Sequence, residues 1–213
     1  MGCTGGNALA ITSFNQGVEN SNLHQNDKTI ADYTKAIELN PKLAMAYINR
    51  GNAYGRLKQF DKAIADLTKA IELDPKSAEA YNNRGNAYLG LQQYDKAIAD
   101  YTQAIELVPK SAKAYNNRGI AYGGLEQFDK AILDFTKAIE LDPKLADAYF
   151  NRGNAYGKLN QYDKAITDCT KAIELEPKSA LAYFNRGHAY LNMGKKKEAE
   201  ADFAKAKMLD EGN

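Results

Sequence analysis

The chain has 213 residues, with 28 Lys and Arg against 27 Asp and Glu, so its formal net charge is +1. This balance argues against a general nucleic-acid-binding protein, which carries a basic excess. A membrane span needs about 18 consecutive apolar residues, and the sequence contains no such run. Two cysteines and two histidines exclude a disulfide framework and a four-cysteine zinc site. We therefore expect a folded chain that needs no metal or cofactor.

The five prolines reveal an internal repeat, because each lies 34 residues after the one before it. They are Pro41, Pro75, Pro109, Pro143 and Pro177. In this register residues 44–213 divide into five full units, which are 44–77, 78–111, 112–145, 146–179 and 180–213. Residues 27–43 match the second half of a partial unit. A fixed period of this length is typical of a solenoid.

The N-terminal segment, residues 1–26, looks irregular. Ile11, Phe14 and Val18 keep helical spacing, so we expect a degenerate first helix within residues 8–20. It would act as an N-terminal cap, and a detachable arm is the alternative. Gly2 followed by Cys3 suggests dual lipidation, but the myristoylation pattern requires Ser or Thr where Gly6 stands. The favoured interpretation is a flexible glycine-rich start on a cytoplasmic protein, with a lipid anchor through Cys3 as the alternative.

Each full unit predicts two helices. In the unit 44–77, Tyr47, Gly51 and Tyr54 lie on one face of the first helix. A break follows, and Asp61 is expected to cap the second helix with its side-chain oxygen. Pro75 ends that helix, since the residue before a proline avoids helical geometry. No strand-like alternation occurs, so we predict an all-α fold.

One glycine recurs inside the first helix of every full unit, where it costs roughly 1 kcal/mol relative to alanine. These glycines are Gly51, Gly85, Gly119, Gly153 and Gly187. We expect each to admit a bulky side chain from the second helix, such as Leu67. Cys169 occupies this place in one unit and should therefore be buried. Helix pairs this short bury their faces by stacking, which predicts a one-dimensional array.

The unit that begins at Ala78 carries the pattern of a known repeat. It has Tyr81, Gly85, Tyr88, Ala97, Tyr101 and Pro109 at the places that define the tetratricopeptide repeat (TPR). The chain resembles TPR proteins closely over residues 27–213. The resemblance implies a right-handed superhelical α-solenoid of antiparallel helix pairs, whose first helices line a concave groove. One departure is systematic, because arginine replaces the apolar residue before each glycine, at Arg50, Arg84, Arg118, Arg152 and Arg186.

An asparagine stands at one place of every first helix. The five are Asn49, Asn83, Asn117, Asn151 and Asn185. An amide offers two donors and an acceptor, which matches a peptide bond. The series resembles the asparagine ladder of the TPR domain of the O-linked N-acetylglucosamine transferase, which implies a grip on the backbone of an extended polypeptide. Recent duplication of one unit would also produce it.

Other side chains are expected to share this groove. Phe150 and Phe184 would be apolar anchors, with Ile48 and Ile120 as further contacts. Asn52, Asn86, Asn154 and His188 lie one helical turn further along the same face. With neighbouring helices about 10 Å apart, the five asparagines of the ladder would span on the order of 12 ligand residues.

A second mode of TPR binding fits less well. Chaperone-adaptor TPR domains hold a carboxylate pair with a five-residue clamp, and Asn52, Asn83 and Lys113 match that pattern. Ile48 and Asn117 replace two of its cationic members. The resemblance therefore does not imply a tight grip on a chaperone tail.

The arginines have a structural interpretation. Every second helix carries an aspartate at one place, and six aspartates flank five arginines. The N-terminal unit has Asp32 but lacks an arginine, so we predict that Arg50 pairs back to Asp32 across the repeat junction. At the other end, Glu200 and Lys207 replace apolar residues of the inner units, which predicts a solvated terminal face.

These observations predict a non-enzymatic protein–protein interaction scaffold that binds an extended peptide or protein segment. We expect no nucleic-acid partner. The alternative is a self-assembling module that forms a homo-oligomer through its ends or its N-terminal segment.

Overall fold

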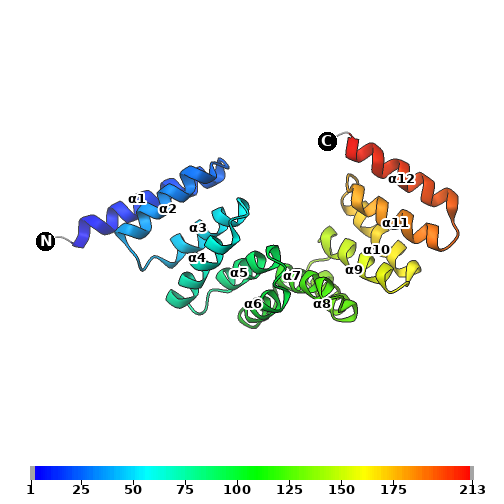
Figure 1. Ribbon diagram of the computed structural model, residues 1–213, viewed down its shortest axis with the longest axis horizontal. Helices are drawn as coiled ribbons and strands as arrows, with labels where there is room; N and C mark the ends of the chain where they lie inside the picture. Colours follow the sequence, from blue (N-terminus) through cyan, green and yellow to red (C-terminus); the bar gives the residue numbers. More distant parts are fainter. Residues whose placement is uncertain (1–2, 212–213) are drawn as a thin grey trace. The chain divides into compact units, whose positions relative to one another are not determined.

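The protein is all-α in the computed structural model, which describes the backbone of residues 3–211 and the side chains from residue 7 onward (Figure 1). Twelve α-helices and no strand occur in this range. The six first helices are α1 (Cys3–Asn22), α3 (Ala44–Arg56), α5 (Ala78–Gly90), α7 (Ala112–Gly124), α9 (Ala146–Lys158) and α11 (Ala180–Asn192). The six second helices are α2 (Asn26–Leu39), α4 (Phe60–Leu73), α6 (Tyr94–Leu107), α8 (Phe128–Leu141), α10 (Tyr162–Leu175) and α12 (Lys196–Glu211).

The helices form two compact units, one that ends at Pro109 and one that begins at Lys110. Within each unit, every first helix packs against the second helix that follows it. The second helix also contacts the next first helix, as α4 does with α5 and α10 with α11. The predicted stack of helix pairs is therefore confirmed within each unit.

The five full repeats begin where the sequence predicts, because α3, α5, α7, α9 and α11 each start at the first residue of a repeat. The capping prediction is wrong. Helix α4 starts at Phe60, and its N-cap residue Gln59 makes no side-chain capping hydrogen bond. Asp61 lies in the first turn instead, where a negative charge interacts favourably with the helix dipole.

The turn between the two helices of each repeat needs one residue in the left-handed conformation. Lys58 has φ 57°, and the backbone N–H of Gln59 donates to the carbonyl of Tyr54 over 2.9 Å, as in a Schellman motif. The same conformation recurs at His24 (55°), Gln92 (56°), Glu126 (57°), Asn160 (58°) and Gly194 (76°). His24 lies one repeat length before Lys58, so the N-terminal helix pair α1–α2 has the same turn as the full repeats.

The repeated glycines admit bulky side chains, as predicted. A Cβ atom on Gly51 would lie 2.8 Å from Cγ of Leu67, and one on Gly85 would lie 2.7 Å from Cε1 of Tyr101. The same close approach occurs in the other full repeats, at Gly119 with Phe135, Gly153 with Cys169 and Gly187 with Phe203. Each glycine therefore lets its two helices approach closely.

Helix α1 is longer than the residues 8–20 expected from its sequence, since its backbone is helical from Cys3. Its residue Gly17 faces Tyr33 of α2, where an added Cβ would lie 2.7 Å from Cε1 of the ring. The Phe14 ring also packs on Tyr33, with centroids 5.5 Å apart. Met1, Gly2 and the side chain of Cys3 lie outside the described part of the chain, and the lipidation hypothesis concerns these residues.

Candidate functional site

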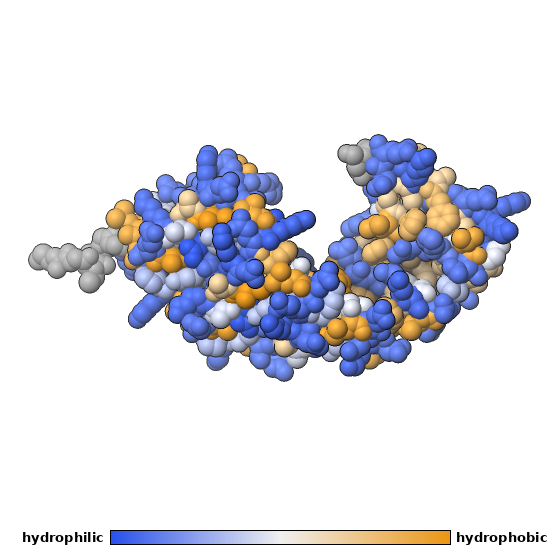
Figure 2. All heavy atoms as spheres, viewed as in Figure 1, coloured by the Kyte–Doolittle hydropathy of each residue, from blue (hydrophilic) through white to orange (hydrophobic). Residues whose placement is uncertain are grey.

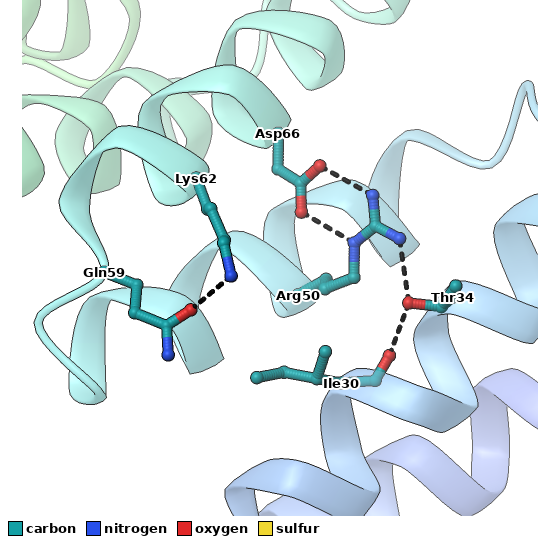
Figure 3. A network of polar contacts seen from close by, with 6 residues as sticks. All are labelled: Ile30, Thr34, Arg50, Gln59, Lys62 and Asp66. Atoms are coloured by element: carbon teal, nitrogen blue, oxygen red, sulfur yellow. Dashed lines mark hydrogen bonds and ion pairs between the residues drawn. The ribbon is translucent and has the colours of Figure 1, made fainter.

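The arginine before each packed glycine is held by a fixed set of partners. Arg50 donates through Nε to Oδ2 of Asp66 over 2.7 Å and through Nη2 to Oδ1 over 2.8 Å. Its Nη1 donates to the hydroxyl of Thr34 on the preceding helix α2 over 2.9 Å (Figure 3). The predicted pair with Asp32 is wrong, because Asp32 accepts from Nδ2 of Asn20 over 2.7 Å.

The same bidentate pair forms in all five full repeats. The others join Arg84 to Asp100, Arg118 to Asp134, Arg152 to Asp168 and Arg186 to Asp202. In the repeat 44–77, hydrogen bonding to Asp66 raises the pKa of Arg50. The guanidinium of Arg50 also lies 5.8 Å and 6.0 Å from the ring centroids of Tyr47 and Tyr54. These arginines therefore stabilise the fold rather than offer free charges to a ligand.

Within the compact unit that ends at Pro109, a hollow of about 390 Å³ opens between two successive repeats. The earlier repeat contributes Asn52, Gly55 and Phe60 to its lining, together with Arg56. Asn83 and Asn86 line it from α5. The predicted groove asparagines of neighbouring repeats therefore meet at one site.

The C-terminal unit has two hollows of the same kind. One, of about 410 Å³, is lined by Ile120, Gly123, Glu126 and Phe128 of one repeat and by Asn151 and Asn154 of the next. The other, of about 340 Å³, is lined by Asn154, Gly157, Lys158 and Tyr162, and then by Phe184, Asn185 and His188. The hollow therefore recurs at repeat junctions, and the side chains that line it vary.

Three glycines of these hollows have no explanation in packing. A Cβ atom added to Gly55, Gly123 or Gly157 would meet no heavy atom within 4 Å. Leucine stands at the equivalent place in the other two full repeats, as Leu89 and Leu191. The sequence contains a signal for these glycines, since three of them recur at one helical place without a bulky partner.

The five ladder asparagines lie on first helices and are all half-buried. Asn49 donates to the Tyr33 hydroxyl over 3.1 Å and Asn151 donates to Oδ1 of Asn116 over 3.1 Å, each in the preceding repeat. The side-chain amide of Asn185 has no hydrogen-bond partner among the described residues. The Oδ1 atom of Asn86, one turn along, accepts from the Tyr101 hydroxyl over 2.8 Å.

The predicted apolar anchors differ in how accessible they are. Ile48 is only 2% exposed within a core cluster, so the prediction that it contacts a ligand is wrong. Phe150 is half-buried and packs against Ala172, Ile173 and Ala182. Phe184 is 47% exposed. Phe184 is therefore the more accessible of the two predicted phenylalanine anchors.

Phe184 belongs to a cluster of rings on the C-terminal unit. Its ring centroid lies 4.5 Å from that of His188 and 5.7 Å from that of Phe203. Apolar surface is visible where α11 meets α12 (Figure 2). This cluster borders the hollow of about 340 Å³ described above.

Cys169 lies in the core, as predicted, and is 0% exposed. Burial, with a smaller contribution from Asp168, raises the pKa of its thiol to about 12, so the thiol stays protonated near neutral pH. Among the described residues, no group of three His, Cys, Asp or Glu side chains could hold a metal ion. None of the described helices is long and apolar enough to cross a membrane.

Comparison with known proteins places the chain in a family. A family model described as tetratricopeptide repeat matches residues 44–77, 78–111, 112–145 and 146–179. Two further repeat models match residues 169–201 and 24–58. No curated protein matches the chain.

Solved structures agree with this assignment. A crystal structure of MamA is 31% identical and aligns over 76% of this chain and 95% of its own, with a TM-score of 0.69. The structure of YrrB, described as a TPR protein with an unusual peptide-binding site, is 28% identical. The alignment covers 83% of this chain and 91% of YrrB, with a TM-score of 0.66. The chain belongs to the tetratricopeptide repeat family, whose arrays of helix pairs are protein-interaction scaffolds.

Proposed function

We propose that this scaffold binds an extended peptide segment along its first helices, with asparagine amides bonded to the ligand backbone and ligand side chains in the hollows. The observation that carries the proposal is the recurring hollow, in which groove asparagines lie beside a glycine that packing does not require. The peptide-binding site named for YrrB is consistent with it.

The spacing of the hollows suits an extended chain. Neighbouring helices pack about 8–10 Å apart, and an extended chain rises about 3.3 Å per residue. Successive hollows of the C-terminal unit would therefore take every third ligand side chain. The missing Cβ at Gly123 and Gly157 leaves room for such side chains beside the helix backbone.

The amides differ in how readily they can bind. Asn49 and Asn151 already donate one N–H within the fold, which leaves a second N–H and part of the oxygen for a ligand. Asn185 has both amide groups available among the described residues and lies beside Phe184. We therefore expect the strongest grip at the hollow between α9 and α11.

Selectivity should come from the side chains around that hollow. Phe184, Tyr162 and His188 give it an aromatic wall, and Lys158 is its cation. An apolar ligand side chain that enters it would bury surface against these rings, which favours binding by about 25 cal/mol per Å².

The test begins with a library of displayed random dodecapeptides selected on the full chain. Calorimetry then measures selected peptides against Asn151→Ala with Asn185→Ala. Loss of two backbone hydrogen bonds at about 1 kcal/mol each should weaken every peptide about 30-fold. Phe184→Ala should instead change the order of affinities among peptides, because it alters one side-chain contact.

A variant that fills the hollow separates binding from folding. Gly157→Leu copies the residue that the chain has at Leu89 and Leu191, and it removes a helical glycine, so the free energy of unfolding should rise by up to about 1 kcal/mol. Peptide affinity should fall nonetheless. Thr167→Ala, on the exposed surface of α10, is the control. Unchanged affinity in the double asparagine variant and in Gly157→Leu would refute the proposed groove.

A further inference from the structure

The C-terminal end of the array carries an apolar hollow of about 420 Å³ between α11 and α12. Leu181, Phe184, Phe203 and Ala206 supply its apolar lining, and Leu181 is 64% exposed. Part of this surface corresponds to places that inner repeats bury, although Met45, at the place of Leu181, is itself 45% exposed. Phe184 stands in the place of Ile48, which packs in a core cluster with Ala80 and Ala87 of the following repeat. In the described chain, Phe184 is therefore exposed at a place where Ile48 is covered by the following repeat.

The N-terminal end of another copy is a poor match for this hollow. The first helix of an inner repeat, such as α5, presents the small apolar residues Ala80 and Ala87 to the repeat before it. In α1 the equivalent places hold Thr12 and Glu19, and both are exposed. Continuing the stack from the end of one chain to the start of another would place a carboxylate against apolar surface, which is costly without a partner.

The charges beside the hollow are complementary to themselves. Glu200 and Lys207 are exposed, have opposite sign and lie seven residues apart, which puts them on one face of α12 about 10 Å apart along its axis. Ala204, between them on that face, is small and exposed. The pair of Lys207 with Glu211 is long, at 3.7 Å, and both side chains are largely exposed, so it constrains Lys207 weakly.

We propose that this face binds the same face of a second copy, with two antiparallel α12 helices related by a two-fold axis between Phe203 and Ala204. Glu200 then faces the partner's Lys207, and Lys207 faces the partner's Glu200. Ala204 permits close approach of the helices, and the hollow is covered by the partner's apolar side chains. A two-fold contact is self-complementary in this way and stops at a dimer.

The size of the patch sets the expected strength. Transient interfaces bury less than about 1,200 Å² in total, and a contact centred on the single helix α12 is expected to belong to that class. The dimer should therefore be reversible and appear at high protein concentration. The apolar contact supplies most of the attraction, and the two ion pairs fix the orientation.

Sedimentation equilibrium of the full chain over a wide concentration range tests the proposal. The native protein should show a reversible monomer–dimer equilibrium. Glu200→Lys alone or Lys207→Glu alone replaces two attractive pairs with two repulsive ones and should weaken dimerisation by at least about tenfold. The double variant Glu200→Lys with Lys207→Glu restores both pairs and should dimerise like the native protein.

Mixing the two single variants gives the sharpest result. A heterodimer of Glu200→Lys with Lys207→Glu contains two attractive pairs, so the mixture should dimerise although neither variant does so alone.

Glu198→Lys reverses a charge elsewhere on α12 and should have little effect. Leu181→Asp should abolish the dimer, whereas Leu9→Asp on α1 should not. A native protein that stays monomeric, or a mixture that fails to recover, would overturn the proposal.

Discussion

Four of the arginines replace an apolar residue with a network that joins two successive repeats, and these are Arg50, Arg84, Arg152 and Arg186. The Arg84 guanidinium bonds both oxygens of Asp100 within its own repeat and donates to the hydroxyl of Thr68 in the repeat before it over 3.1 Å. Both charged side chains are mostly buried, so each needs the other as a partner. The last repeat has Ala204 at the threonine place, where the described chain holds no following arginine.

A double-mutant cycle tests this pairing. Arg84→Ala and Asp100→Ala should show a coupling energy above about 0.5 kcal/mol in urea unfolding, since the two side chains are in direct contact. Arg84→Ala with Asp66→Ala is the matched control, because Asp66 is bonded to Arg50. A larger coupling in the control cycle would favour a pair across the junction instead.

At the scale of the helix pair, the turn between the two helices holds residues in a backbone conformation that their side chains disfavour. Five of the six turns place a residue other than glycine in the left-handed region, and only the last turn has glycine there, as Gly194. Side chains disfavour this conformation by roughly 1–2 kcal/mol. The backbone hydrogen bonds that close the turn, such as that of Gln93 to Tyr88 over 2.9 Å, hold the conformation in place.

Gln92→Gly should therefore stabilise the protein. The strain at φ 56° disappears, partly offset by the greater entropy of glycine in the unfolded chain, for a net gain of up to about 1 kcal/mol. Gln92→Ala retains the strain and should give no such gain in urea unfolding. Asn160→Gly should gain less, because asparagine tolerates this region. Equal stability of the glycine and alanine variants at Gln92 would contradict this account.

At the scale of the whole molecule, each repeat is stabilised mainly by its neighbours. In the described chain α4 contacts both α3 and α5, and α10 contacts both α9 and α11. Helix α1 packs on α2, and α12 packs on α11. Stability in such arrays is approximately a sum of repeat and nearest-neighbour terms, so the end helices should open first.

Hydrogen exchange of the native protein measures this difference. Amide protection should be lowest in α1 and α12 and higher in α4 and α10, because opening an end helix breaks one set of contacts rather than two. Uniform protection along the chain would mean that the array unfolds as one cooperative block.

The sequence by itself determined the repeat, the helix pairs and the packed core. Proline spacing fixed the period, and the places of Gly51 and Leu67 predicted the contact between the two helices of one repeat. These features follow from the sequence because both contacting residues lie in the same short unit, at a constant separation. The family assignment rests on the same regularity.

Only the tertiary structure decided which residues meet across repeats. The count of arginines and aspartates fitted either Asp32 or Asp66 as the partner of Arg50, and helix geometry selected Asp66. Ile48 is exposed or buried depending on the repeat that follows it, so its burial could not be read from its own unit. The hollows also arise between repeats, where three-dimensional spacing, rather than the periodicity of one unit, sets which side chains face each other.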